Sequence, residues 1–281
     1  MTTSYFTDQN LAQFETFGYL GFPALLADRA DAIIQEFEAI WARQGGGHGG
    51  KPHDGTARSA MVQFLDQSEY LSTLLDDPRV HDIAASILGD DFNYMGSDGN
   101  FYAGETNWHS DGYGGRGGVR HIKIAFYLDP LTRDTGALRV IPGSHRVGEP
   151  YADQVERDTR NSQTVWGIAG NQVPAQALET KAGDVLVFNH DLKHSAWGGS
   201  KRRRMFTMNC CQRYPEARLP ELREYIGGAS RFWIERAYDD TIVRTASPER
   251  MVHLEQVLAN DGGLAELSRK RRAEMPEPSR G

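Results

Sequence analysis

The stretch Asn107-Trp108-His109-Ser110-Asp111-Gly112 places an imidazole and a carboxylate two residues apart. In an extended strand, side chains at positions i and i+2 project to the same side, so both groups can reach one ion without bending of the backbone. In a helix, the same spacing would point the two side chains away from each other. A second stretch far along the chain, His190-Asp191-Leu192-Lys193-His194, offers two further imidazoles.

Two histidines and one carboxylate are the ligand set of the facial triad in mononuclear non-haem iron oxygenases. We therefore predict that His109, Asp111 and His194 occupy one face of a ferrous ion, and His190 competes with His194 for the third position. Ligands confined to one face leave the other positions of an octahedral ion open for a bidentate cosubstrate and dioxygen.

The composition of the chain is that of an ordinary globular protein. It has 281 residues, of which 39% are hydrophobic and 25% are charged, and these values fit one large domain. The net charge of −7 argues against general nucleic-acid binding. The longest apolar run, residues 19–26, is short and contains Pro23, so no membrane span is expected. Nothing in the sequence indicates a particular oligomeric state.

The two cysteines, Cys210 and Cys211, are adjacent. Neighbouring side chains on a strand face opposite ways, so this pair is poorly placed for a disulfide or a shared metal. Residues 1–10 lack the basic and apolar parts of an export signal. We expect a reducing, cytoplasmic location.

The N-terminal part, residues 1–91, is predicted to support the core. A strand-like run at 17–22 precedes a helix whose apolar residues recur at helical spacing. A second helical region spans 68–88 and ends at Gly89. Between the two, a glycine-rich stretch carries His48 and His53, which we expect to be solvated.

Residues 92–214 change to a pattern of strands and turns. Segment 121–128 alternates cleanly, with Ile122, Ile124, Phe126 and Leu128 on one face. Residues 146–177 are long, polar and poorly patterned, and we interpret them as an irregular lid over the site. Residues 215–267 are predicted to be helical, and the basic, proline-containing residues 268–281 to be a disordered tail. The sequence thus predicts a single domain with a mainly β core and flanking helices.

Four blocks of the sequence resemble the phytanoyl-CoA dioxygenase family of Fe(II)/2-oxoglutarate oxygenases, in the family's order, within a likeness that covers residues 10–215. They are Trp108-His109-Ser110-Asp111, the stretch from Gly136 to His145, the stretch from Gly183 to His194, and the arginine-led strand after it. The resemblance implies a double-stranded β-helix, which is a jelly-roll, cupin-like barrel of two antiparallel sheets.

The same resemblance implies roles for individual residues. It favours His194 over His190 as the third ligand, and it makes His145 part of a turn. It gives Arg203 the role of holding the distal carboxylate of 2-oxoglutarate, with Arg204 as the reserve candidate. A guanidinium suits this role because its rigid fork donates two parallel hydrogen bonds to a carboxylate. Thr207, four residues farther on, and Tyr102 are also expected at the cosubstrate.

The implied reaction uses Fe(II), 2-oxoglutarate and O2, releases succinate and CO2, and oxidises a small-molecule substrate. Related halogenases carry Gly or Ala in place of the carboxylate ligand, so Asp111 favours hydroxylation or another halide-free oxidation. Two other functions remain open. One is a cupin-like, metal-dependent isomerase or hydrolase, in which Arg203 would have no purpose. The other is a non-catalytic binding barrel, which an intact triad argues against.

Overall fold

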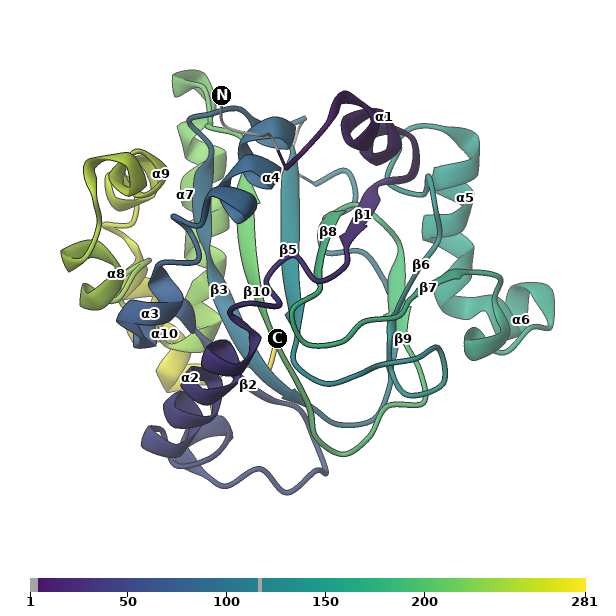
Figure 1. Cartoon of the computed structure of the whole chain (residues 1–281), viewed down its shortest axis with the longest axis horizontal. Coiled ribbons are helices and arrows are strands. Elements are labelled where there is room, and N and C mark those ends of the chain that lie inside the picture. The colour runs from purple at the N-terminus through teal and green to yellow at the C-terminus, as the bar shows by residue number, and fades with distance from the viewer. Residues whose placement is uncertain (1–4, 116–117) are drawn as a thin grey trace.

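Two antiparallel sheets form the centre of the protein (Figure 1). The computed structural model describes residues 5–115 and 118–281. Within these residues the larger sheet contains, in spatial order, β1 (Tyr19–Phe22), β8 (Val185–Asn189), β5 (His121–Tyr127), β10 (Arg203–Cys211), β3 (Asn93–Tyr102) and β2 (Ser59–Val62). The smaller sheet contains β4 (Thr106–His109), β9 (His194–Ala196), β6 (Leu138–Val140) and β7 (Gln176–Leu178).

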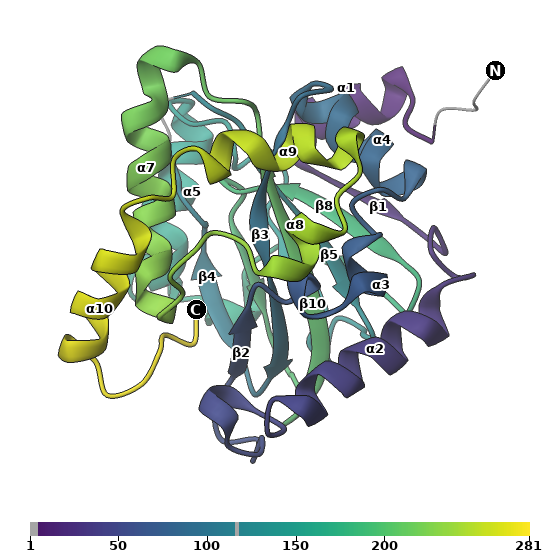
Figure 2. The ribbon, with the colours of Figure 1, turned by 90° about the vertical axis from the view of Figure 1, so that its left-hand side faces the viewer.

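Helices from both ends of the chain cover the outer face of the larger sheet (Figure 2). The N-terminal ones are α1 (Asp8–Phe17), α2 (Ala30–Arg43), α3 (Glu69–Ser72) and α4 (Pro78–Leu88). The C-terminal ones are α7 (Leu219–Gly228), η6 (Ala229–Phe232), α8 (Asp240–Arg244), α9 (Pro248–Leu258) and α10 (Leu264–Glu274). On the far side of the smaller sheet lie α5 (Pro150–Asp158) and α6 (Ser162–Trp166) (Figure 1).

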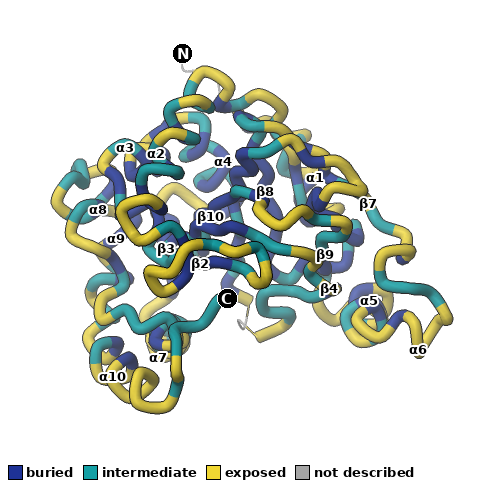
Figure 3. Tube along the Cα trace, turned by 90° about the horizontal axis from the view of Figure 1, so that it is seen from below, coloured by how far each residue is buried: buried dark blue, intermediate teal, exposed yellow. Residues whose placement is uncertain are grey.

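The central strands β5 and β10 alternate between two environments. On one face their side chains belong to the main hydrophobic core, together with residues of the covering helices; these are Ile122, Ile124, Phe126, Phe206 and Met208. On the other face their side chains line a space between the sheets; these are Lys123, Ala125, Tyr127, Met205 and Thr207. The alternation predicted for residues 121–128 is confirmed. Figure 3 shows that the buried stretches gather toward the middle of the molecule, whereas exposed stretches lie mainly at its outer edge.

Strand β3 is the main element that the sequence pattern does not reveal. It runs from Asn93 to Tyr102, within the region 92–214 where only a general pattern of strands and turns was predicted. Its middle contains Gly96, Ser97, Asp98 and Gly99, which hide the hydrophobic pattern. Gly99 is required by packing, because a Cβ there would lie 2.1 Å from the Phe64 ring.

The expectation of an irregular lid at 146–177 is wrong in its local structure. The segment contains α5, α6 and two 3-10 turns before β7. Pro150 begins α5 at its first turn, where a proline loses no hydrogen bond. Only Ala152 and Val155 of α5 are buried, so the helix has too few apolar residues to be recognised from its spacing.

The expectations for the glycine-rich stretch and for the tail are also wrong. His48 is buried, and its ring nitrogens lie 3.0 Å from the carbonyl oxygens of Ala60 and Pro278. Residues up to Glu274 continue α10, and Arg280 donates to the carbonyl of Arg58 at 2.8 Å. Polar groups of the tail thus find backbone partners on β2 and its flanks, which composition alone does not reveal.

Cys210 and Cys211 are both buried, and neither is part of a disulfide. No helix in the described ranges is both long enough and apolar enough to cross a bilayer.

Asp66 provides a test of how burial affects stability. This carboxyl group is fully buried, and the backbone N–H of Asp239 donates to it at 2.9 Å. Burial raises its pKa to about 7. Because the folded-state pKa lies above the unfolded value, the stabilising effect of the protonated group is complete below about pH 4. That effect is lost as the pH rises through about 7.

We expect Asp66→Asn to remove this pH dependence. Relative to the variant, the wild type should lose on the order of 2–4 kcal/mol of unfolding free energy between pH 5 and pH 8.5, since one pKa unit corresponds to about 1.36 kcal/mol. Urea unfolding followed by tryptophan fluorescence at several pH values measures this difference. Parallel pH profiles for the two proteins would contradict the assignment.

Candidate metal centre

The antiparallel pairing of β4 with β9 brings the two histidine-containing stretches together. His109 lies directly opposite His194 in this pair, and their ring centroids are 4.1 Å apart. The backbone N–H of Asp111 then donates to the carbonyl of His190 at 2.8 Å, which continues the contact past the end of β4. Ligand atoms of His109, Asp111 and His194 all lie within 4.8 Å of one another.

Both histidines are oriented by backbone carbonyl groups two residues earlier. Nδ1 of His109 lies 2.8 Å from the Asn107 oxygen, and Nδ1 of His194 lies 2.8 Å from the Leu192 oxygen. An Nδ1–H that donates to a carbonyl leaves the Nε2 lone pair available to a metal ion. Burial lowers the pKa of His109, and burial together with His109 lowers the pKa of His194 to about 3. Both imidazoles are therefore neutral at physiological pH, as metal ligands must be.

Asp111 is held as a carboxylate by Lys123 on β5. The Lys123 Nζ atom lies 2.8 Å from Oδ2 of Asp111. Burial alone would raise the pKa of Asp111, but Lys123 and the nearby histidines hold it well below its usual range. Asp111 and Asp98 in turn raise the pKa of Lys123 although that amine is buried. The site thus contains a permanent negative charge beside two neutral imidazoles.

Glu156 of α5 joins the two segments that carry the candidate ligands. Its carboxylate accepts a hydrogen bond from the Ser110 hydroxyl at 3.0 Å and forms an ion pair with Lys193 at 2.9 Å. Ser110 lies between His109 and Asp111, and Lys193 precedes His194. The Lys193 side chain is only 2% exposed and also donates to the Glu156 carbonyl. Glu156 therefore fixes the relative position of both segments.

A cavity of about 870 Å³ opens beside the three candidate ligands. Residues from both sheets line it, including all three members of the triad and Arg203. Its volume lies toward the upper end of the range of about 300–1,000 Å³ that is usual for small-molecule sites. The cavity is therefore large enough for a small dicarboxylate and a second reactant.

Arg203 begins β10 and points into this cavity. Its two terminal nitrogens donate to the carbonyls of Gly136 and Gly104 at 2.6 and 2.8 Å. A Cβ at Gly136 or at Gly199 would lie within 2.5 Å of the guanidinium, so the two glycines leave the room that it occupies. The side chain is buried and burial lowers its pKa, while Nε has no partner among the described residues. A buried N–H group that lacks a protein partner and borders a cavity can donate a hydrogen bond to a bound anion.

The other predicted cosubstrate residues lie in different surroundings. Tyr102 pairs with Arg203 across β3 and β10, and the guanidinium lies 5.6 Å from its ring centre. Thr207 also lines the cavity, where its hydroxyl donates to Asp98. Arg204 points to the opposite face of β10, where it pairs with Asp129 and with Glu38 of α2. Arg204 thus does not join the group around the cavity.

The alternatives to the predicted ligands also have clear positions. His190 lines the cavity but is not among the three residues whose ligand atoms converge. His145 does not line the cavity; its ring packs against Gly18, where a Cβ would lie 2.5 Å from Nδ1.

Sequence reasoning missed Lys123, Asp98 and Arg58, which place charge inside the cavity. Arg58 pairs with Asp98 at 3.3 Å, and Asp98 also accepts hydrogen bonds from Asn100 and Thr207. Burial alone would raise the pKa of Asp98, but Lys123 and Arg58 lower it. A signal for Lys123 was present, because it is a charged residue between isoleucines on a strand that is otherwise apolar.

The family model that matches the sequence describes phytanoyl-CoA dioxygenase, and it covers residues 14–205. The chain belongs to the phytanoyl-CoA dioxygenase family. The resemblance seen in the sequence is therefore confirmed.

Curated relatives match this family member over part of its length. Ectoine dioxygenase of Sphingopyxis alaskensis is 29% identical over 170 residues, which are 53% of this chain and 55% of that protein. The uncharacterized protein Rv1501 of Mycobacterium tuberculosis is 36% identical over 80 residues, 28% of this chain and 24% of that protein. The chain thus spans about half the length of the first relative and a quarter of the second.

Three solved structures that share the fold of this chain are described by their reaction or by what they bind. The α-ketoglutarate-dependent carbocyclase SnoK from nogalamycin biosynthesis has a TM-score of 0.59 and 21% identity, covering 75% of this chain and 86% of that one. HygX from Streptomyces hygroscopicus, with nickel and 2-oxoglutarate bound, has a TM-score of 0.57 and 15% identity, covering 74% and 88%. EctD from S. alaskensis with bound Fe has a TM-score of 0.56 and 21% identity, covering 75% and 78%. These likenesses confirm the double-stranded β-helix.

Replacing the two competing histidines separately tests which one is a ligand. We expect His194→Ala to abolish Fe(II) or Co(II) binding, because it removes one of three converging donors. His190→Ala should retain metal affinity within a few-fold. Anaerobic Co(II) titration followed by visible absorption measures both. Equal losses in the two variants, with both proteins folded, would contradict the assignment.

Glu156→Ala tests the link between the ligand-bearing segments. We expect metal affinity to fall by about 10–100-fold, the range typical for residues that orient ligands. The change also leaves the buried Lys193 ammonium without its carboxylate, so the melting temperature should drop. Glu149→Ala is a matched control, since Glu149 is an exposed glutamate at the start of the same helix. An unchanged metal affinity in Glu156→Ala would show that the link has no such role.

Proposed function

We propose that the protein is an Fe(II)/2-oxoglutarate-dependent oxygenase that hydroxylates a small molecule at an unactivated C–H bond. The observation that carries the proposal is the convergence of His109, Asp111 and His194 in the same cavity as the buried, partly unpaired Arg203. Membership of the family, whose relatives include ectoine dioxygenase, supports it. Decarboxylation of 2-oxoglutarate to succinate and CO2 would accompany the oxidation of the substrate.

The donor set of the site fits iron. His109 and His194 would each supply Nε2, and Asp111 would supply one carboxylate oxygen. Three protein ligands on one face are the arrangement used by non-haem Fe(II) oxygenases. With the ion bound, iron and dioxygen supply the oxidising chemistry, which no protein side chain can provide. Lys123, which pairs with Asp111, would restrain the carboxylate oxygen that does not bind the ion.

Arg203 would bind the distal carboxylate of 2-oxoglutarate. Its terminal nitrogens are oriented by the carbonyls of Gly136 and Gly104, so the guanidinium is held in place before the cosubstrate arrives. The Tyr102 ring would border the same end of the cavity, and the Thr207 hydroxyl, four residues along β10, would lie farther toward its middle. Arg204 is a poorer candidate, because Asp129 and Glu38 already neutralise it on the other face of the strand.

The same arginine separates the proposal from a cupin-like isomerase or hydrolase. Such an enzyme needs the metal ligands but has no use for a buried cation that faces the metal cavity. A buried guanidinium is costly unless it is paired, so its position supports an anionic cosubstrate. Asp111 at the carboxylate position supports hydroxylation over halogenation.

Anaerobic addition of Fe(II) and 2-oxoglutarate tests the proposal directly. We expect the weak visible absorption band of the iron–2-oxoglutarate chelate, and its loss in Asp111→Ala. Arg203→Ala should raise the Kd for 2-oxoglutarate at least about 30-fold, because truncating one partner of a buried charge pair costs about 2–5 kcal/mol. Arg204→Ala is the matched control and should leave this Kd nearly unchanged. Absence of the band in the metal-loaded wild type would refute the function.

A further inference from the structure

The cavity extends well past the three candidate ligands. Along β10, Arg203, Thr207 and Asn209 all line it. At about 3.4 Å per residue, the six steps along the strand from Arg203 to Asn209 span roughly 20 Å. Asn209 lies directly opposite Lys123, the partner of Asp111, so it is level with the metal site or beyond it. If 2-oxoglutarate occupies the Arg203 end, as proposed above, the Asn209 end remains for the second reactant.

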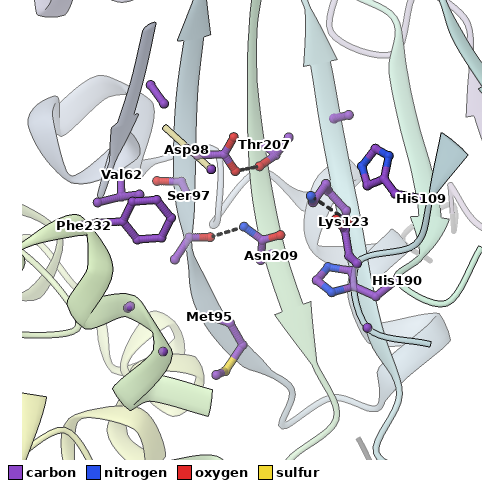
Figure 4. A pocket seen from close by; sticks show the side chains of 18 of the residues that line it. Val62, Met95, Ser97, Asp98, His109, Lys123, His190, Thr207, Asn209 and Phe232 are labelled. Atoms are coloured by element: carbon purple, nitrogen blue, oxygen red, sulfur yellow. Dashed lines mark hydrogen bonds and ion pairs between the residues drawn. The ribbon is translucent and has the colours of Figure 1, made fainter. Parts of the chain in front are cut away.

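The surface at the Asn209 end is mostly apolar. Figure 4 shows the ring of Phe232 beside Val62, on the side of the cavity away from His109, with Met95 lower in the view. The side chains of Ser97 and Asn209 there carry no charge, and Asp98, which lies opposite Val62 on the neighbouring strand, is paired with Arg58. We call the set Val62, Met95, Ser97, Asn209 and Phe232 the distal subsite.

Part of the distal subsite comes from residues outside the family match. The family model ends at residue 205, whereas Asn209 and Phe232 lie beyond it. Phe232 ends η6, directly after α7, and both elements pack against α10. The C-terminal helices therefore build a wall of the cavity that family membership does not specify.

The charged groups deeper in the cavity already have partners. Lys123 pairs with Asp111, and Arg58 pairs with Asp98. Glu221, Glu224 and Arg231 also border the cavity, and all three are exposed to solvent; the Arg231 guanidinium lies 4.7 Å from the centre of the Phe232 ring. A charged group placed against Phe232 and Met95 would lose hydration and gain only the weak, solvent-screened attraction of these exposed charges, and this is costly. An uncharged group would lose little, and an amide or hydroxyl could hydrogen-bond to Asn209.

We propose that the distal subsite binds the substrate, and that the part of the substrate held there is uncharged. It would present an apolar ring or short chain to Phe232, Val62 and Met95, and a neutral hydrogen-bonding group to Asn209. The inference rests on the proposed function only where it calls the bound molecule the substrate. The expected preference of the distal subsite for an uncharged group does not depend on a bound metal.

Three probes of one shape and different charge test the subsite. They are cyclohexanecarboxamide, cyclohexanecarboxylate and cyclohexylmethylammonium, and ligand-observed NMR measures their binding to the metal-free full chain. We expect the carboxamide to bind about tenfold or more tightly than either ion, since unpaired charges are disfavoured in such a site. Equal affinities, preference for an ion, or no detectable carboxamide binding would each overturn the proposal.

Two variants connect this binding to named residues. Phe232→Ala should weaken carboxamide binding about tenfold or more, because large side chains in a pocket contribute most of the affinity. Phe17→Ala, which removes an exposed phenylalanine of α1, is the control and should have no effect. Asn209→Asp keeps the shape of the side chain and should shift the preference to the ammonium probe. An unchanged probe preference in Asn209→Asp, with the fold intact by circular dichroism, would contradict the subsite.

The absorption band of the iron–2-oxoglutarate chelate separates the two proposals. If the band forms but the carboxamide does not bind, the subsite is wrong and the oxygenase stands. If the carboxamide binds with the expected preference but the band is absent, the oxygenase proposal fails and the subsite remains.

Discussion

The pairing of β4 with β9 is the interaction on which the rest of the site depends. It places His109 opposite His194 and leads Asp111 to the carbonyl of His190. Backbone hydrogen bonds define this register, so the two imidazoles converge before any metal is present. Glu156 adds a second connection between the same segments from outside the barrel. A site assembled in this way loses little conformational entropy when an ion binds.

The larger sheet serves stability and chemistry with opposite faces of the same strands. Ile124 and Phe206 pack under the helices, while their neighbours Lys123 and Thr207 face the cavity. The period of two in a strand makes this separation possible, since each residue points away from the next. A shift of one residue in β10 would turn Arg204 and Phe206 toward the cavity and Arg203 toward the helices, so the core enforces the register of the site.

Charge inside the barrel is arranged in pairs. Lys123 with Asp111 and Arg58 with Asp98 allow buried ionised groups to persist, while Arg203 keeps one nitrogen without a partner in the described part of the chain. Paired charges are tolerated in a low-dielectric interior, and an unpaired donor favours an anionic ligand. The cavity therefore presents a cationic side chain, which favours an anion, at its Arg203 end and a mostly apolar surface at its Phe232 end.

The local sequence was sufficient to place His109 and Asp111 on one side of the chain, and for the alternation of β5 and helix α2, because spacing along one element decides which side chains share a face. The ordered blocks were sufficient for the family and the barrel. Local spacing could not reveal α5, the strand through Gly96 and Gly99, or the buried His48, since each is stabilised by partners distant in the chain. The choice between His190 and His194, the separation of Arg203 from Arg204, and the wall formed by Phe232 likewise depend on which segments pack together. Such long-range contacts leave no periodic trace in the sequence.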